Sequence, residues 1–236
     1  MLLIMKKIIS LMAALFIAAA VEAKTLVVYY SYTNKCHEIV TTLTSKIEVD
    51  VVRIEPAEKG QKYEANNYAL GTLLLNAIKA NPNDASSYPA IEPVDVSLDD
   101  YQNIIVVTPL WWSQMAAIMQ TYLFNNSAQM AGKTVAMIVS SYSSSISDVV
   151  ADAQRLLPNV TWAGDALWIN NASHSNRSSL IQNWLPTQTF ATSGATAINS
   201  VRTNENNSSR AYTLQGTLAQ ACQKGIIIQN GKKQIR

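Results

Sequence analysis

Residues 24–37 read KTLVVYYSYTNKCH, and this stretch decides the fold. Its segment 25–30 is apolar apart from the first residue and rich in β-branched and aromatic side chains, which is typical of a buried strand in a parallel sheet. Small polar residues follow at once, and apolar residues then recur at positions 39, 40, 43 and 47, the spacing of one helix face. The stretch therefore predicts a strand, a hydroxyl-rich turn and a helix in direct succession.

The turn between this strand and helix is a candidate phosphate site. A helix N-terminus offers unpaired N–H groups and the positive end of the helix dipole, and hydroxyls beside it complete a cradle for a phosphate. The turn lacks Gly-x-x-x-x-Gly-Lys-Ser/Thr and Gly-x-Gly-x-x-Gly, which argues against a triphosphate loop and against the usual dinucleotide fingerprint. An ordinary Ser/Thr helix cap is the alternative interpretation.

The turn resembles the phosphate loop of the flavodoxin family, in which the first strand runs into Ser/Thr-x-Thr-Gly-x-Thr/Ser. Ser31 and Thr33 match this pattern, whereas Asn34 replaces the usual Gly and Cys36 the usual Thr or Ser. Asn tolerates positive φ better than most residues, while a thiol is a weaker donor than a hydroxyl. The resemblance implies that the phosphate of FMN is held by Ser31, Tyr32, Thr33, Asn34, Lys35 and Cys36.

The rest of the chain alternates between strands and helices. Apolar runs predict strands at 25–30, 49–56, 103–108, 133–139 and 166–169, and helical spacing predicts helices near 37–47, 67–80, 116–123, 147–157 and 178–185. We expect all of these strands to be of the buried type, and their alternation with helices indicates an α/β fold. The resemblance implies a flavodoxin-like, doubly wound, parallel five-stranded sheet of order 2-1-3-4-5 over residues 24–185. Ligands of such sheets bind at the carboxyl ends of the strands, where polar turns follow predicted strands one, three and four.

Two further turns resemble flavin loops of the family. Pro109, Leu110, Trp111 and Trp112 resemble the Pro-Ile/Leu-Trp-Trp-Gly segment of a flavodoxin subgroup, which implies a wall for the flavin ring. Successive side chains of an extended segment point opposite ways, so we expect one tryptophan in the core and the other toward the ligand. The serine-rich turn stands where the third flavin loop lies, which implies contacts with the pyrimidine edge of the ring from Ser140, Ser141 and Tyr142; the alternative is an ordinary loop.

Residues 1–23 have the pattern of a secretory signal peptide. Lys6 and Lys7 precede an apolar run, and Val21 and Ala23 are small residues at the −3 and −1 positions of a cleavage site. The apolar run is about 14 residues long, short of the roughly 20 that span a bilayer, which argues against a retained anchor. We therefore expect an exported protein, periplasmic, cell-surface or secreted.

Composition and charge narrow the class of protein. The chain has 236 residues, 48% of them hydrophobic, and a net charge of +2. Residues 24–183 carry ten Lys/Arg against fourteen Asp/Glu, and residues 184–236 carry six against one, so the expected domain is mildly acidic and the tail basic. We expect no nucleic-acid partner. The two cysteines form no disulfide framework, and we interpret Cys36 as a small residue in a Thr position.

We expect residues 186–236 to form a linker and a β-rich tail. Asn230-Gly231 beside a β-branched run is a strong hairpin signal. The tail resembles the sorting tails of type IX secretion, with Tyr-x-Leu-x-Gly, Lys-Gly-Ile and Asn-Gly-Lys-Lys, although Ile227 stands at a conventional Tyr. The resemblance implies contact with export machinery or the cell surface; the alternative is a β appendage docked on the core.

The sequence gives no sign of catalytic or metal-binding residues. Its two histidines form no Ser/His/Asp or metal-ligand cluster, and we interpret His37 as a first-turn helix residue and His174 as a loop residue. The flavodoxin resemblance implies non-covalent FMN and redox chemistry at the flavin, in an electron carrier or a quinone- or NAD(P)H-type reductase. The rival hypothesis is a non-catalytic surface protein that keeps the fold without flavin, which the Asn34 and Cys36 departures favour. The redox partner or small-molecule acceptor is not identified by the sequence, and a quinone is one candidate.

Overall fold

The computed structural model describes residues 23–190, 211–213, 226–229 and 232–235. The predicted signal peptide, up to residue 22, lies outside the described residues. Contacts divide the chain into two compact units, one ending at Gly194 and the other beginning at Ala195. We describe each unit by itself, and the sequence-derived domain limits stay a prediction.

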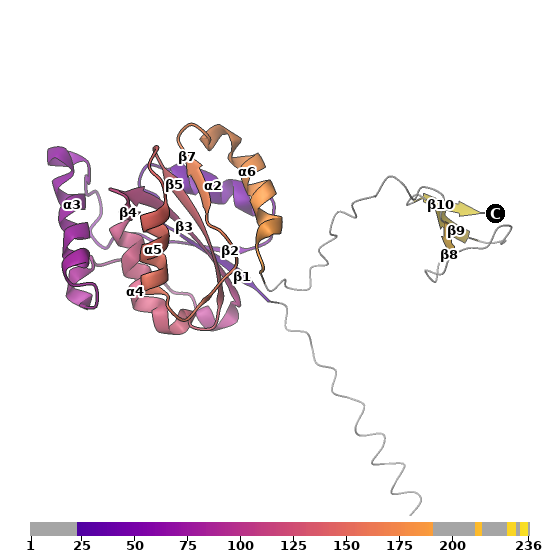
Figure 1. Ribbon diagram of the computed structural model, residues 1–236. Coiled ribbons are helices and arrows are strands. Elements are labelled where there is room, and N and C mark those ends of the chain that lie inside the picture. Colours follow the sequence, from indigo (N-terminus) through magenta and orange to yellow (C-terminus); the bar gives the residue numbers. More distant parts are fainter. Residues whose placement is uncertain (1–22, 191–210, 214–225, 230–231, 236) are drawn as a thin grey trace, which may run out of the picture. The chain divides into compact units, whose positions relative to one another are not determined.

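The first unit is built on a parallel sheet (Figure 1). Its order is β2-β1-β3-β5, with β6 and β7 both beside β5, and a short β4 pairs antiparallel with β3. The α/β fold class and the predicted order are confirmed, but the fifth position is split between two strands and β4 is an addition. The strands are β1 (Thr25–Tyr29), β2 (Asp50–Arg53), β3 (Asn103–Trp111), β4 (Gln114–Met115), β5 (Thr134–Ser141), β6 (Thr161–Trp162) and β7 (Leu167–Asn170).

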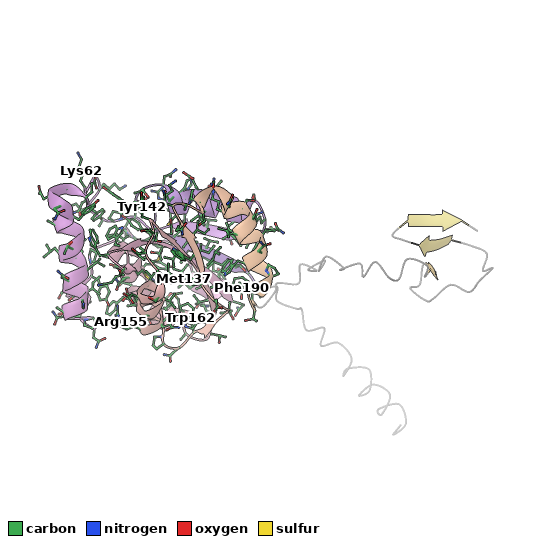
Figure 2. The ribbon with its side chains drawn as sticks, turned by 45° about the horizontal axis from the view of Figure 1, so that its top comes forward. Lys62, Met137, Tyr142, Arg155, Trp162 and Phe190 are labelled. Atoms are coloured by element: carbon green, nitrogen blue, oxygen red, sulfur yellow. The ribbon has the colours of Figure 1, made fainter. Side chains whose placement is uncertain are left out.

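Helices cover both faces of this sheet (Figure 1). Leu26 and Val28 of β1 belong to a core cluster that includes buried residues of α3, α4 and α5, while Val27 and Tyr29 belong to a second cluster with α2 and α6. Figure 2 shows side chains filling the layers between helices and strands. None of the helices in the described residues is long and apolar enough to cross a membrane. The α-helices are α2 (Lys35–Thr44), α3 (Ala65–Ala80), α4 (Ala117–Met130), α5 (Ser147–Leu156) and α6 (Arg177–Trp184), and the 3₁₀ turns are η1 (Ala85–Ser87), η2 (Leu98–Asp100), η3 (His174–Asn176) and η4 (Leu185–Thr187).

Two strands depart from the prediction. The second predicted strand, 49–56, is shorter as β2, and its exposed Val51 and Arg53 correct the expectation that all strands are buried, because β2 lies at the sheet edge. Pro109 does not end the third strand, since β3 continues to Trp111. The Val107 C=O faces β1 and accepts from the Tyr30 N–H at 3.2 Å, and residue 109 faces the same way beyond the end of β1. Its missing N–H therefore removes no bond to β1.

The second unit contains β8 (Ala211–Thr213), β9 (Ile226–Gln229) and β10 (Lys232–Ile235), which form an antiparallel sheet of order β10-β9-β8. Gln229 pairs with Lys232, so two residues connect β9 and β10. This pairing confirms the hairpin predicted from Asn230-Gly231. The sorting role of the tail stays a prediction.

Candidate functional site

The three polar turns singled out in the sequence follow the carboxyl ends of neighbouring parallel strands. In the sheet register Tyr29 of β1 pairs with Val107 of β3, Pro109 pairs with Ser140 of β5, and Ser141 lies beside β7. Because the strands are parallel, the turns after β1, β3 and β5 all leave the same edge of the sheet. The topology therefore brings the predicted loops to one site.

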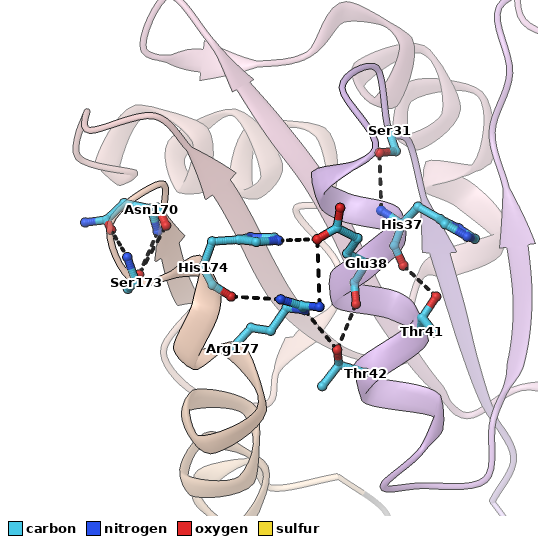
Figure 3. A network of polar contacts seen from close by, with 9 residues as sticks. All are labelled: Ser31, His37, Glu38, Thr41, Thr42, Asn170, Ser173, His174 and Arg177. Carbon is cyan, nitrogen blue, oxygen red and sulfur yellow. Dashed lines mark hydrogen bonds and ion pairs between the residues drawn. The ribbon is translucent and has the colours of Figure 1, made fainter.

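The turn after β1 has the backbone of an anion-binding loop. Asn34, the residue before α2, has φ of 68° and ψ of −10°, a left-handed conformation that Gly adopts most easily and Asn tolerates. The Asn34 C=O accepts the first helical bond, from the Glu38 N–H at 3.0 Å, and Ser31 Oγ accepts from the His37 N–H at 3.2 Å (Figure 3). As predicted, His37 lies in the first turn of the helix.

This turn leaves backbone donors free. Within residues 23–190, the N–H groups of the five residues between Ser31 and His37 donate to no protein acceptor, and the Thr33 hydroxyl has no hydrogen bond. Both Thr33 and Asn34 are exposed, so a ligand can reach the loop. Successive free N–H groups beside a helix N-terminus attract anions.

Cys36 differs from the other loop residues because its side chain points into the protein. It is 1% exposed and packs in the core cluster of α2 and α6. Burial raises the pKa of the Cys36 thiol, and a hydrogen bond with Ser140 opposes that rise only in part. The thiol therefore stays protonated near neutral pH, which disfavours nucleophilic or redox reactivity. Cys36 therefore contributes its backbone N–H to the loop, and its side chain does not reach the site.

The turn after β3 is a tight hairpin. Trp111 pairs with Gln114, so only Trp112 and Ser113 connect β3 and β4, and their φ angles are 46° and 67°. Two positive φ angles define a type I′ turn, which usually takes Asn and Gly. Such a conformation costs about 1–3 kcal/mol in a bulky residue such as Trp, so the surroundings must hold it.

A polar network from two helices holds the hairpin in place. Asp152 Oδ2 of α5 accepts from the Met115 N–H at 2.9 Å, and the fully buried Gln120 of α4 donates to the Met115 C=O at 2.8 Å. Arg155 of α5 donates to Gln120 at 3.0 Å and to Asp152 at 3.4 Å. Burial raises the pKa of Asp152, and the bonds from Met115 and Arg155 act against the rise. Both backbone groups of Met115 are thereby fixed.

The two tryptophans lie in different surroundings. Trp111 is 9% exposed and packs against Tyr63 at 4.6 Å and Tyr30 at 5.8 Å between ring centroids. Trp112 is 43% exposed, and its ring lies over Gly71 of α3. The sequence expectation of one buried tryptophan is confirmed, and whether Trp112 faces a ligand stays a prediction.

Sequence reasoning missed two aromatic residues of the site: Tyr63, just before α3, and Tyr68, within α3. The exposed Tyr68 approaches Trp112 at 5.3 Å, and Tyr32 approaches Tyr63 at 5.1 Å and donates a hydrogen bond to Glu64. Tyr68 ends a run of three left-handed residues, 66–68, at the start of α3. Aromatic residues in the otherwise polar stretch 57–93 were the only sequence signal for these contacts.

The turn after β5 uses its hydroxyls internally. Ser140 and Ser141 are 8% exposed and belong to β5 itself. Ser141 Oγ donates to the Ser144 C=O at 2.9 Å and accepts from Trp168 Nε1 of β7 at 2.8 Å, so its proton is already engaged. Tyr142 is 80% exposed. Backbone groups and Tyr142, rather than the Ser141 hydroxyl, are what this turn offers a ligand; Trp168 was not singled out in the sequence.

A second polar network joins α2 to η3 and α6 (Figure 3). His174 is 5% exposed, and its Nε2 donates to Glu38 Oε2 at 2.8 Å, which corrects its assignment as a loop residue. Arg177 approaches the same Glu38 oxygen at 3.8 Å and donates to Thr42 Oγ1 at 3.1 Å. Sequence alone gave no sign of this pairing, because 136 positions separate Glu38 from His174. The network fastens the first turn of α2, which carries the free N–H groups.

Gly71→Ala tests the contact between the Trp112 ring and α3. A Cβ at Gly71 would lie 2.6 Å from Cη2 and 2.7 Å from Cζ3 of Trp112, so the ring must move. In a Trp112→Phe protein we expect Gly71→Ala to increase the free energy of unfolding by up to about 1 kcal/mol, because Ala favours helix over Gly. With Trp112 present the gain should shrink or reverse. Urea unfolding of the four proteins measures this coupling, and equal gains in both backgrounds would contradict the contact.

Glu38→Gln tests the network between α2 and α6. The hydrogen bond from His174, with the positive charges of Lys35 and Arg177 nearby, lowers the pKa of Glu38. A carboxyl with a lowered folded-state pKa stabilises the protein above its unfolded pKa of about 4.3, and this contribution is lost as pH falls through the folded value. We therefore expect the variant to melt below wild type at pH 6.

The difference between the two melting temperatures should shrink as the pH falls below about 4.3 and through the lowered folded-state pKa of Glu38, because the carboxyl is then protonated in both the folded and the unfolded protein. Glu48→Gln is the matched control, because Glu48 is exposed and makes no ion pair within the described residues. A melting difference for Glu38→Gln that stays constant from pH 6 to pH 3 would show that the carboxylate charge does not stabilise this contact.

Solved structures share this fold. Two candidate flavoproteins, from Bacteroides eggerthii and Bacteroides uniformis, align with TM-scores of 0.54 each, at 23% and 26% identity, over 70% and 68% of this chain and 98% and 99% of theirs. A flavoprotein from Lactobacillus acidophilus, solved in complex with FMN, aligns with a TM-score of 0.53 at 18% identity, over 66% of this chain and 99% of that one. A search of curated proteins gave no significant match.

The family assignment rests on the chain's own sequence. The model of a family described as flavodoxin matches residues 24–188, which include β1, the loop after it and both of the other predicted turns. This match covers more than half of the chain and coincides with the parallel sheet described above. The chain therefore belongs to the flavodoxin family.

Proposed function

We propose that the chain binds FMN non-covalently at the carboxyl edge of its sheet and serves as an exported redox protein. The observation that carries the proposal is the set of free N–H groups between Ser31 and His37, with the exposed Thr33 hydroxyl beside them. A phosphate monoester is the group that such a loop recognises best. The FMN complex of the related Lactobacillus acidophilus protein supports this choice of ligand.

The residues present fit each part of FMN. The loop donors suit its phosphate, and the positive φ of Asn34 supplies the turn that Gly usually provides. The exposed indole of Trp112 offers a flat apolar wall for the ring, and the backbone around Tyr142 offers hydrogen-bonding groups for the ring edge. Bound FMN would supply electron transfer, while the protein orients the flavin and sets its surroundings.

Within this proposal the protein is an electron carrier or a reductase of quinones or other small acceptors. No side chain is assigned as a catalytic acid or base. The rival hypothesis, a surface protein without flavin, rested on Asn34 and Cys36. Asn34 keeps the left-handed loop geometry, and Cys36 keeps its backbone in the loop, so neither departure closes the site.

The proposal includes export, on the basis of the signal-peptide pattern in residues 1–23 and the β-rich tail. We expect the protein recovered from its native cells to begin at Lys24, outside the cytoplasm. Mass spectrometry of the N-terminus after cell fractionation measures both properties. A chain that keeps its first 23 residues and stays in the cytoplasmic fraction would reject export while leaving the flavin proposal intact.

A flavin titration tests the binding proposal. The purified protein should take up one FMN, with quenched flavin emission and the shifted visible bands of bound oxidised flavin. Thr33→Ala should weaken FMN binding by about 1–3 kcal/mol, roughly a five- to 150-fold rise in Kd, because a phosphate oxygen loses its donor. Thr41→Ala is the matched control, since the Thr41 hydroxyl donates to the His37 C=O within α2.

The outcomes separate the hypotheses. A wild-type protein that stays colourless and leaves FMN emission unchanged would favour the surface protein without flavin. A wild type that binds FMN, with Thr33→Ala and Thr41→Ala equally unaffected, would keep the cofactor and remove Thr33 from the phosphate site.

A further inference from the structure

We infer that Arg53, on the edge strand β2, is a positioning residue for the phosphate of FMN, acting through the peptide between Ser31 and Tyr32. The inference rests on the proposed function and deepens it. Arg53 does not belong to any of the three loops, and neither the sequence motifs nor the family resemblance pointed to it. Its role follows from the contacts of its guanidinium group.

The guanidinium group of Arg53 is held at three points. Its Nη2 donates to the Ser31 C=O at 3.2 Å, and its Nε lies 2.5 Å from Glu55 Oε1. Its Cζ lies 5.9 Å from the centre of the Tyr29 ring, within the range of a cation–π contact. An Arg with its planar group engaged in this way has few orientations left, although the side chain remains 41% exposed.

The bond to the Ser31 C=O fixes a donor as well as an acceptor. In a trans peptide the C=O of one residue and the N–H of the next point in opposite directions, and no peptide bond among the described residues is cis. When Arg53 holds the Ser31 C=O toward β2, the Tyr32 N–H must point away from β2. That N–H is the first of the free donors in the loop.

Ser31 is held on its other side as well. Its Oγ accepts from the His37 N–H at 3.2 Å, and His37 Nδ1 lies 2.8 Å from the hydroxyl of Tyr29, the residue on which Arg53 lies (Figure 3 shows the Ser31–His37 bond). Ser31, Arg53, Tyr29 and His37 thus form a closed ring of contacts around the start of the loop. A rotation of the Ser31–Tyr32 peptide would break the Arg53 bond in this ring.

The opposite peptide orientation would disfavour a phosphate. A flipped Ser31–Tyr32 peptide removes one N–H donor from the loop and turns a carbonyl oxygen toward the anion, which repels it. Glu55 already pairs with Arg53, so the net charge that the pair adds to the site is small. The direction of the peptide, rather than the charge of Arg53, is therefore the expected contribution.

The test compares FMN with riboflavin, which has the same ring and lacks the phosphate. Flavin fluorescence titrations give both Kd values for wild type, Arg53→Gln, Arg53→Lys and Lys79→Gln. Lys79 is an exposed cation near the far end of α3, so its variant loses the same charge away from the loop. Thermal melting without flavin checks that each variant folds, and Arg53→Lys carries the test if Arg53→Gln melts early.

We expect both Arg53 variants to raise the Kd for FMN about tenfold or more, because lysine keeps the charge but lacks the planar group that engages three partners. The Kd for riboflavin should change by less than about twofold, and Lys79→Gln should change neither. Three outcomes would overturn this inference and leave the proposed function intact. They are equal losses of affinity for FMN and riboflavin, full FMN affinity in Arg53→Lys, and unchanged FMN binding in both Arg53 variants. A wild type that binds neither flavin would reject the proposed function together with it.

Discussion

The constraint on which the rest of the site depends is that backbone N–H groups need an acceptor. The parallel sheet aligns the carboxyl ends of β1, β3 and β5, and α2 begins only a few residues after β1 ends. The first N–H groups of a helix have no partner within it, and the turn at Asn34 adds further N–H groups that point to no protein acceptor within residues 23–190. Donors left without a protein acceptor cost free energy unless another partner binds them, so solvent or an anionic ligand must supply the acceptors at this exposed loop. The fold thereby creates a place for a phosphate before any side chain is considered.

The aromatic side of the site depends on the strained β3–β4 turn, which side chains of α4 and α5 hold in place. Trp112 and Ser113 adopt positive φ, and neither is a residue that prefers it. The network of Asp152, Gln120 and Arg155 fixes both backbone groups of Met115, the second residue of β4. A buried polar network stabilises one arrangement only when all of its members are bonded, and these members are. The exposed indole of Trp112 is therefore presented by a rigid hairpin rather than by a free loop.

The parts of the structure that could be predicted are those governed by local pattern. The buried run of β1, the helical spacing of α2 and the polar turns gave the fold and the edge of the sheet where the site lies. The β3–β4 hairpin was missed because a proline such as Pro109 normally ends a strand. Pro109 is tolerated within β3 because it lies beyond the end of β1. Tyr63 and His174 were missed because their roles depend on partners far away in the chain, Trp111 and Glu38, which no local pattern links. Long-range side-chain contacts depend on how the elements pack, and the periodicity of the sequence does not predict that packing.

The contacts around α2 explain how the Glu38 carboxylate can lie near a loop that is proposed to bind an anion. Glu38 lies in the first turn, where a negative charge favours the helix dipole but would also compete with a bound phosphate. His174 and Arg177 engage that carboxylate from the α6 side, so its charge is directed away from the loop, while Arg53 holds Ser31 from the β2 side. Helix and loop are thus fastened by side chains on two opposite flanks that do not occupy the free N–H groups. The donors remain oriented and available because the bonds that stabilise this segment are made by other atoms.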